Sequence, residues 1–254
     1  SLSFLAIRTS FIKDDELNNS PTFTRFTKNR EIIRDRLNNL NTQGEYGLNS
    51  QDVLIPAFIS AYSDSDPSSY SLKPFPKIPI PNWRVDFSGL SKIESLSEIF
   101  SNITISHAYQ SIYSIGEFSN SLLYVDNLDF NNSIMNYPLA SQQTENGLIP
   151  FYIINQVRIT ERFSPLIGIN VRTKNNLNAR VDYKKDRNIM LNLSNSQVSE
   201  MRNSDFSLDF GYTKDKLKLP FKYMGNTIIL DNEIEFRLNF IIRNTKTIQR
   251  KIDK

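Results

Sequence analysis

The second half of the chain alternates apolar and polar residues with a period of two, which predicts β-strands with one apolar and one polar face. The clearest pair covers residues 166–173 and 177–184, which Asn175 and Asn176 join as a tight turn. We therefore expect a mainly β protein with roughly ten or eleven antiparallel strands. The same alternation recurs at residues 83–87, 103–113, 151–160, 206–212 and 234–242.

Each predicted strand assigns its side chains to one of two environments, because neighbouring residues point to opposite faces. The polar residues of one parity are expected to line a hydrated lumen. They are Gln156, Arg158, Thr160, Asn170, Arg172, Asn178, Arg180, Asp209, Glu235, Arg237 and Asn239. The apolar residues of the other parity are expected to face lipid. They are Ile153, Val157, Ile167, Ile169, Val171, Val181, Phe206, Leu208, Phe236 and Leu238.

Residues 20–62 follow a helical period and are predicted to form a helical insertion. Ser20 and Pro21 are typical of an N-cap and of the first helical residue. A second helix is expected to start near residue 50, with Pro56 bending or restarting it. Together with a short helix between residues 90 and 100, this gives two or three amphipathic helices near the N-terminal side.

The other segments complete one predicted domain. Residues 1–13 alternate like a strand, and residues 63–81 are rich in Ser and Pro and predict an extended linker. Residues 82–254 hold the main strands and loops. Within them, polar runs predict a long loop at 125–148 and a turn near 201–205.

Charged residues cluster in two places. The acidic run 14–16 is expected to be a solvated turn after the first strand. The net charge of +3 is too small to indicate a nucleic-acid partner. A later basic cluster is expected to lie on a solvated face or loop. It comprises Arg172, Lys174, Arg180, Lys184, Lys185 and Arg187.

Hydropathy and periodicity point to different classes of protein. The mean hydropathy of −0.40 is typical of a soluble protein, and no apolar run approaches the ~18 residues of a membrane-spanning helix. A barrel strand needs only alternate apolar residues, and the predicted strands run for about 9–13 residues, as spanning strands do. Their apolar faces often end in aromatic residues. We therefore predict a segment of a transmembrane antiparallel β-barrel.

The composition offers little for catalysis. The chain has no cysteine and one histidine, His107, so neither a thiolate metal site nor a histidine-based triad is expected. With eight glycines, the sequence shows no phosphate-binding loop or dinucleotide fingerprint. We predict no catalytic, cofactor-binding or metal-ligating residues, and a protein that is not an enzyme.

Six segments carry a more specific signal. In their order along the chain they resemble the carboxy-terminal part of the SprA/Sov family, the outer-membrane translocon of the type IX secretion system in Bacteroidota. Ala108 stands where a glycine would be expected from that resemblance. The segments are 26–37 (FTKNREIIRDRL), 46–62 (YGLNSQDVLIPAFISAY), 79–93 (PIPNWRVDFSGLSKI), 106–118 (SHAYQSIYSIGEF), 154–187 (INQVRITERFSPLIGINVRTKNNLNARVDYKKDR) and 244–253 (NTKTIQRKID).

The resemblance implies a barrel of very many strands in the outer membrane of a Gram-negative bacterium, with this chain as part of its wall. It implies passage of folded cargo proteins to the cell surface, in type IX secretion and gliding motility. The implied partners are the rest of the barrel chain, a PorV-type shuttle, a plug protein, secreted cargo and outer-membrane lipid. No cofactor is implied.

Two other function classes remain open from the residues alone. A porin or a TonB-dependent transporter would show the same alternation on a complete set of strands. A secreted β-sandwich that acts as a binding module would turn its apolar face inward. Because the predicted strand set is unfinished, we expect the chain to be a piece of a larger protein or a processed product.

Overall fold

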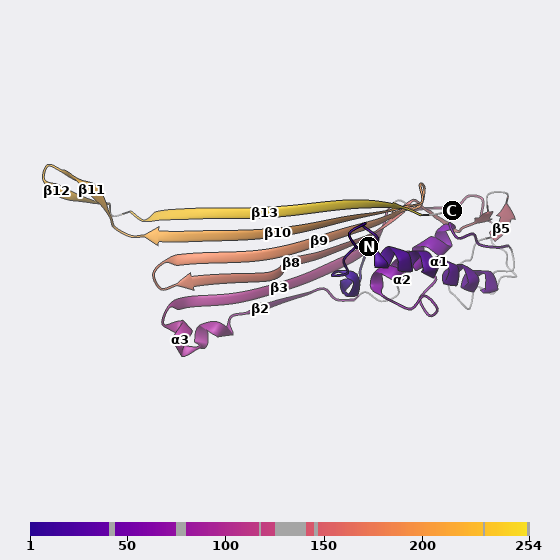
Figure 1. The fold of residues 1–254 in the computed structure, drawn as a ribbon, viewed down its shortest axis with the longest axis horizontal. Coiled ribbons are helices and arrows are strands. Elements are labelled where there is room, and N and C mark those ends of the chain that lie inside the picture. The colour runs from indigo at the N-terminus through magenta and orange to yellow at the C-terminus, as the bar shows by residue number, and fades with distance from the viewer. Residues whose placement is uncertain are drawn as a thin grey trace.

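The computed structural model describes residues 1–40, 44–74, 80–116, 118–124, 141–144, 147–230 and 232–252. The side chains of residues 141–147, 217–223 and 226–230 lie outside this description. In this part of the chain the protein is mainly β, with antiparallel sheets and three α-helices. The long strands run side by side away from a helical region at one end (Figure 1).

The two longer helices begin where the sequence predicts. Helix α1 spans Pro21–Leu40, and the Phe23 backbone N–H donates to the Ser20 hydroxyl over 3.3 Å, as an N-cap does. Helix α2 spans Gln51–Ser63 and continues through Pro56, so the expected restart there is wrong. Helix α3 spans Glu94–Ser97. Within the described residues, none of the helices combines the length and the apolar character needed to cross a membrane.

Seven strands form the main sheet, in the order β1-β3-β8-β9-β10-β13, and β2 also pairs with β3. Among the described residues the sheet is open, with β13 at one edge and β1 and β2 at the other. Every pair in it is antiparallel. The strands are β1 (Leu2–Ser3), β2 (Trp83–Phe87), β3 (Phe100–Ile115), β8 (Gln156–Thr173), β9 (Leu177–Asn192), β10 (Gln197–Lys214) and β13 (Ile234–Lys251).

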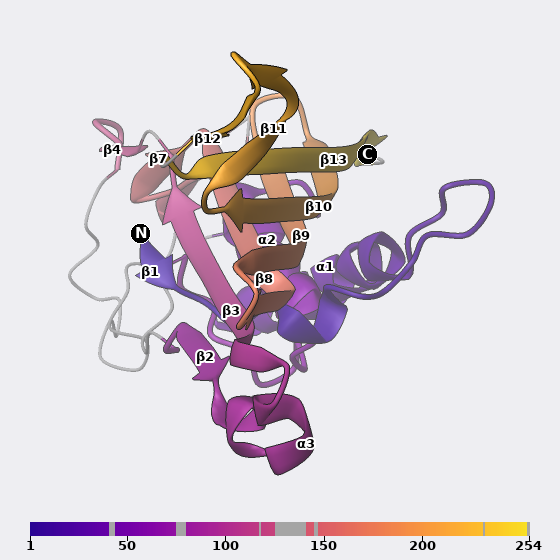
Figure 2. The ribbon, with the colours of Figure 1, turned by 90° about the vertical axis from the view of Figure 1, so that its left-hand side faces the viewer.

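The described residues also form three two-stranded sheets, two of which, β5–β6 and β11–β12, are hairpins. Figure 2 looks along the strands from their free end, with α3 and one of these hairpins, β11–β12, in front of α1 and α2. The two-stranded sheets pair β4 (Phe118–Asn120) with β7 (Tyr152–Ile154), β5 (Ser141–Thr144) with β6 (Gly147–Ile149), and β11 (Leu217–Tyr223) with β12 (Asn226–Leu230). The hairpin β5–β6 occupies the end of the predicted loop 125–148 and extends to Ile149. Residues 125–140 and 145–146 of that loop lie outside the described residues, as do 75–79 of the linker.

The long strands exceed the predicted length. Strands β8, β10 and β13 each contain 18 residues and β9 contains 16. The β8–β9 hairpin turns at the expected place, with Asn176 in the left-handed region at φ 60°. The turn expected near residues 201–205 is wrong, because those residues lie inside β10 and pair with β9 and β13.

The predicted first strand is also largely wrong. Only Leu2 and Ser3 pair with β3, and a single 3-10 turn follows at Ile7–Thr9. We call residues 6–19 the strap, because they lie over one face of the main sheet and bond to side chains on five of its strands. Side chains of the sheet form hydrogen bonds with the backbone N–H and carbonyl groups of the strap. These groups therefore need no strand partner.

The hydrophobic core lies at one end of the sheet. Helix α2 is its centre, and every residue from Val53 to Tyr62 is buried. Phe26 of α1 meets Phe58 of α2 edge to face at 6.2 Å. The strands contribute Val157, Ile159, Ile189, Leu191 and Val198 to the same core. The helices therefore cover one end of one sheet face and leave the other end bare.

Candidate functional site on the two faces of the sheet

The strand register sorts the side chains into two faces. Odd-numbered residues of β3, β8 and β9 align with even-numbered residues of β10 and β13, as in the row Ile169, Val181, Leu208 and Phe240. We call this side the apolar face and the opposite side the polar face. All eleven residues expected to line a lumen lie on the polar face. That they border a lumen stays a prediction.

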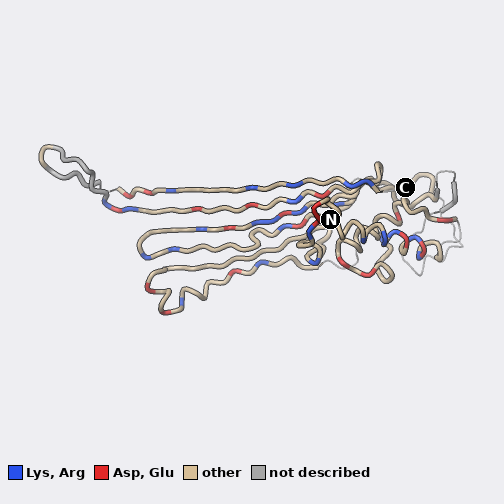
Figure 3. Tube along the Cα trace, in the orientation of Figure 1, with Lys and Arg blue, Asp and Glu red and all other residues tan. Residues whose placement is uncertain are grey.

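The polar face is held by pairs of side chains that reach between strands or along one strand. Arg243 on β13 pairs with Asp205 on β10 at 2.8 Å, and Arg172 donates to Asn178 over 3.0 Å across the β8–β9 hairpin. Arg237 pairs with Glu235 at 2.7 Å on β13. This pairing keeps opposite charges adjacent on the polar face. Figure 3 shows that basic and acidic residues are interspersed along the long strands.

The apolar face carries large side chains that nothing in the described structure covers. Leu238 is 64% exposed, Phe240 50% and Ile242 55%. On a soluble monomer such contiguous apolar exposure is rare beyond a few hundred Å². We call these side chains the distal band. It comprises Ile105, Ile167, Ile169, Val171, Val181, Tyr183, Phe206, Leu208, Phe210, Phe236, Leu238, Phe240 and Ile242.

Two of the residues expected to face lipid lie elsewhere. Val157 is on the apolar face but is fully buried beneath the helices, so that expectation is wrong. Ile153 lies on the short strand β7, outside the main sheet, and pairs with Ser119. The other eight lie in the distal band. Their contact with lipid stays a prediction.

Between the helix-covered core and the distal band, the apolar face carries a row of buried charged residues. Arg187 on β9 is 2% exposed and its Nε lies 3.1 Å from Glu161 on β8. Its Nη1 donates to the Thr9 carbonyl over 2.8 Å, and its Nη2 donates to the Thr9 hydroxyl over 2.8 Å. Glu161 also accepts from Ser10 and from Tyr109, over 2.5 and 2.7 Å. Arg187 and Glu161 thus fasten the first half of the strap.

A second set of charges fastens the other half of the strap. Asp14 pairs with Arg250 on β13 at 2.9 Å and with Arg202 on β10 at 3.5 Å. Glu200 joins the two arginines, with its carboxylate 2.8 Å from Arg202 and 3.4 Å from Arg250. Arg202 also donates to the Ile12 carbonyl over 3.2 Å. Three arginines and three carboxylates therefore balance, as buried charges must.

These contacts correct two expectations about charged residues. The Asp14 side chain is only 3% exposed, so the first residue of the acidic run is not solvated. Arg187 and Lys185 of the basic cluster lie on the apolar face under the strap, where Lys185 donates to the Ser10 carbonyl and lies 4.4 Å from the Phe11 ring. Arg172 and Arg180 lie on the polar face, as expected.

Sequence reasoning missed the buried network because its partners are distant in the chain. A signal was present: Glu161, Arg187 and Arg202 break the alternation by placing charges on the apolar parity of their strands. A charge at such a position indicates a buried partner or a local cover. The strap provides both.

The titratable groups around the helices are shifted by burial. Desolvation raises the pKa of Tyr62, and it raises the pKa of Asp52 to about 6. In the strap, hydrogen bonds from Asn19 hold the pKa of Asp15 below its usual value. In the described part of the chain, no group of three or more His, Cys, Asp or Glu side chains could hold a metal ion.

Neither the family models nor the curated proteins include a match to this chain. The site is therefore defined by geometry alone: one sheet, a polar face, a distal band and a strapped, helix-covered end.

Proposed function

We propose that the chain is a wall segment of an outer-membrane β-barrel through which folded proteins pass to the cell surface. One observation carries the membrane part of this proposal: the distal band is exposed and apolar, and the face behind it is polar. Lipid on one side and water on the other is the environment that such a sheet fits.

The dimensions of the band support this placement. On β13 the band runs from Phe236 to Ile242, and with Ile234 of the same parity the apolar run covers about 26 Å of strand at ~3.3 Å per residue. At the ~40° tilt of barrel strands this corresponds to roughly 20 Å of height. The apolar band of outer-membrane barrels is about 25 Å tall. An unpaired strand edge is costly in lipid, so further strands must pair with β13 at one edge and extend the pairing of β3 at the other.

The export part of the proposal rests on the resemblance of the six segments to the SprA/Sov family. In this role the polar face lines the passage for cargo, and its adjacent opposite charges leave no strong local charge to which a folded protein would stick. The shuttle, the plug protein and cargo would contact the barrel, and no chemistry is performed on the cargo.

A cysteine scan tests the membrane placement. These 254 residues contain no cysteine, so each single-cysteine variant adds one reactive thiol to this segment. In intact outer membranes, a membrane-impermeant maleimide should label Asp209→Cys and Asn239→Cys and leave the adjacent Leu208→Cys and Phe240→Cys unlabelled. Equal labelling of neighbours, or the reverse parity, would overturn the proposal. Extraction of the protein without detergent would favour a soluble sandwich instead.

A crosslinking experiment separates export from simple permeation. A photo-crosslinking amino acid at Asn170 or Asn239 should capture secreted cargo proteins in living cells, whereas the same group at Leu208 should not. A porin or a transporter of small molecules would pass the cysteine test and capture no secreted protein from the polar face. The two experiments thus test the barrel and its cargo independently.

A further inference from the structure

The apolar face changes character in steps along the strands. At the helix-covered end it is a buried apolar core, then the charged row with Glu161 and Arg187 follows, and then the distal band begins at Ile167. If the band lies in lipid, as the proposed function has it, the charged row lies just outside the hydrocarbon. The strap covers that row, so it lies at the level of the lipid headgroups.

The exposed side chains of the strap fit this level. Phe11 is 52% exposed and Leu17 is 81% exposed. The Phe11 ring centroid lies 5.4 Å from that of Phe163, which belongs to the row next to the distal band. Trp83 stacks on Tyr109 at 4.5 Å in that same row. Aromatic side chains at this position resemble the aromatic girdles of membrane barrels.

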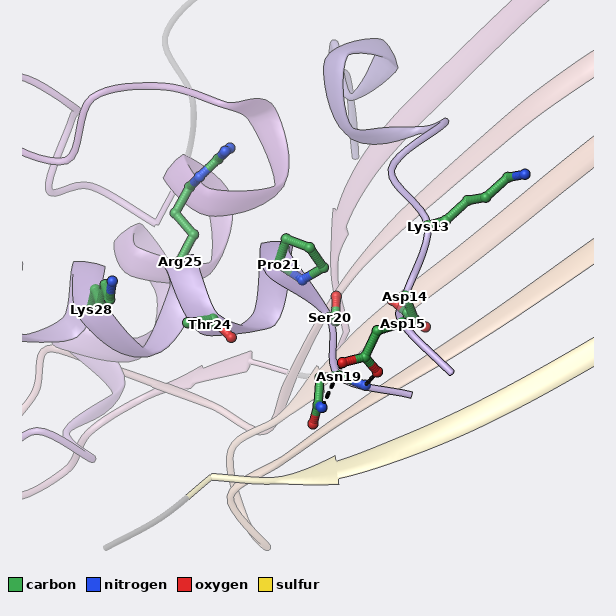
Figure 4. A pocket seen from close by; sticks show the side chains of 9 residues that line it. All are labelled: Lys13, Asp14, Asp15, Asn19, Ser20, Pro21, Thr24, Arg25 and Lys28. Carbon is green, nitrogen blue, oxygen red and sulfur yellow. Dashed lines mark hydrogen bonds between the residues drawn. The ribbon is translucent and has the colours of Figure 1, made fainter. Parts of the chain in front are cut away.

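A basic cavity lies between the strap and the start of α1. It has a volume of about 560 Å³ and is lined by residues 13–15, 19–21, 24, 25 and 28 (Figure 4). Two of its cations, Lys13 and Lys28, are exposed, and no carboxylate in the described part of the chain lies within ion-pair distance of either. Figure 4 shows Lys13 extending away from α1, on the side toward which the strands run.

The negative groups of the cavity are already engaged. Asp14 is bound by Arg202 and Arg250, and Asp15 accepts hydrogen bonds from Asn19 and from the Leu17 backbone. Arg25 pairs with Asp64, outside the cavity lining. The donors to Asp15 are neutral, so Asp15 keeps its negative charge, and Lys13 and Lys28 together leave the cavity lining an excess of one positive charge.

We infer that the strap and this cavity bind the phosphate groups of lipid headgroups, with Lys13 and Lys28 as the principal contacts. Lipid is the occupant that the geometry favours because the strap, which borders the cavity, reaches the row next to the distal band through Phe11, and phosphate is opposite in charge to the two lysines. The inference rests on the proposed function. It adds that the strap lies at the membrane surface and that the lipid bound there is recognised by its phosphate group.

The test uses the full-length protein in lipid nanodiscs. Leu17→Cys carries a bimane fluorophore, and quenching is measured with nitroxides placed on the headgroups of anionic or of zwitterionic lipid at equal mole fraction. A lysine near an anionic membrane surface gains about 1 kcal/mol, which corresponds to an about fivefold preference for anionic lipid beside it. We therefore expect clearly stronger quenching by the anionic lipid, and a loss of that preference in Lys13→Gln/Lys28→Gln.

Lys251→Gln is the matched control, since Lys251 lies at the same end of the sheet but on the polar face, and it should keep the preference. Equal quenching by both lipids would overturn the inference, as would a preference that survives the double substitution. So would competition by inorganic phosphate at low concentration, which would indicate a site for the free ion. If no headgroup nitroxide quenches bimane while the cysteine parity holds, the strap inference alone is wrong.

Discussion

The two ends of the apolar face share the same alternation of apolar and polar residues, but one end is buried and the other is exposed. Leu191 at one end is fully buried under α2, whereas Leu238 at the other is 64% exposed. A period of two reports only that one face is apolar; what covers that face is decided by segments elsewhere in the chain. Here the cover is a helix pair and a strap for one end, and nothing in the described structure for the other.

The largest effect should come from the charged row that divides the two ends. Arg187→Ala leaves Glu161 buried without its cation and frees the carbonyl of Thr9, so we expect a loss of about 3–5 kcal/mol in the free energy of unfolding. Denaturant unfolding in detergent measures it. Arg237→Ala, which breaks an exposed pair on the polar face, is the control and should cause no measurable loss. Equal losses would mean that the strap is not fastened by these charges.

A matched pair of leucines compares the two ends directly. Leu191→Ala opens a cavity in the helix-covered core and should cost about 2–5 kcal/mol of unfolding free energy. Leu238→Ala removes exposed surface and should change stability by no more than about 0.5 kcal/mol. The same unfolding assay serves both variants. A large loss for Leu238→Ala in detergent would show that another protein surface covers the distal band.

A charge placed on either side of one strand sharpens the proposed membrane position. Leu238→Arg would put a guanidinium into lipid and should reduce the stability of the inserted protein by about 2–4 kcal/mol. Asn239→Arg, one residue away on the polar face, should insert normally. The amount of heat-resistant, folded protein in the outer membrane reports the difference. Normal insertion of both variants would contradict the lipid contact.

The smallest effect concerns the pH dependence of the covered end. Burial raises the pKa of Asp52 to about 6, so the folded state holds a proton more tightly than the unfolded state does. This contribution to stability is complete below about pH 4 and is lost as pH rises through about 6. Because Asp52 is only partly buried and lies in the first turn of α2, we expect a change on the order of 1 kcal/mol. Asp52→Asn should abolish it in unfolding curves recorded between pH 4 and 7.

Local signals predicted the parts of the fold that local physics decides. Ser20 and Pro21 marked the start of α1, Asn175 and Asn176 marked the β8–β9 turn, and parity placed Asn170 and Arg180 on one face. Each of these features depends only on residues that are close in sequence or that face each other across one hairpin.

The failures all involve contacts between distant segments. Residues 1–13 alternate as a strand would, yet beyond Ser3 they form most of the strap, because Arg187 and Tyr109 bind their polar groups. Val157 has the parity of a lipid-facing residue, but helices from the first quarter of the chain cover it. Asp14 lies in a polar run typical of a turn and is buried by arginines from β10 and β13. No local pattern contains these partners.

The strap has a consequence for the order of assembly. Its contacts join residues that are 151 positions apart at Ser10–Glu161 and 236 positions apart at Asp14–Arg250. Contacts of such separation form late, because the intervening chain must first be ordered. Since the strap needs β8, β9, β10 and β13 side by side before its charges are compensated, its docking requires that these four strands have already paired. The first residues of the chain are thus among the last to reach their native position.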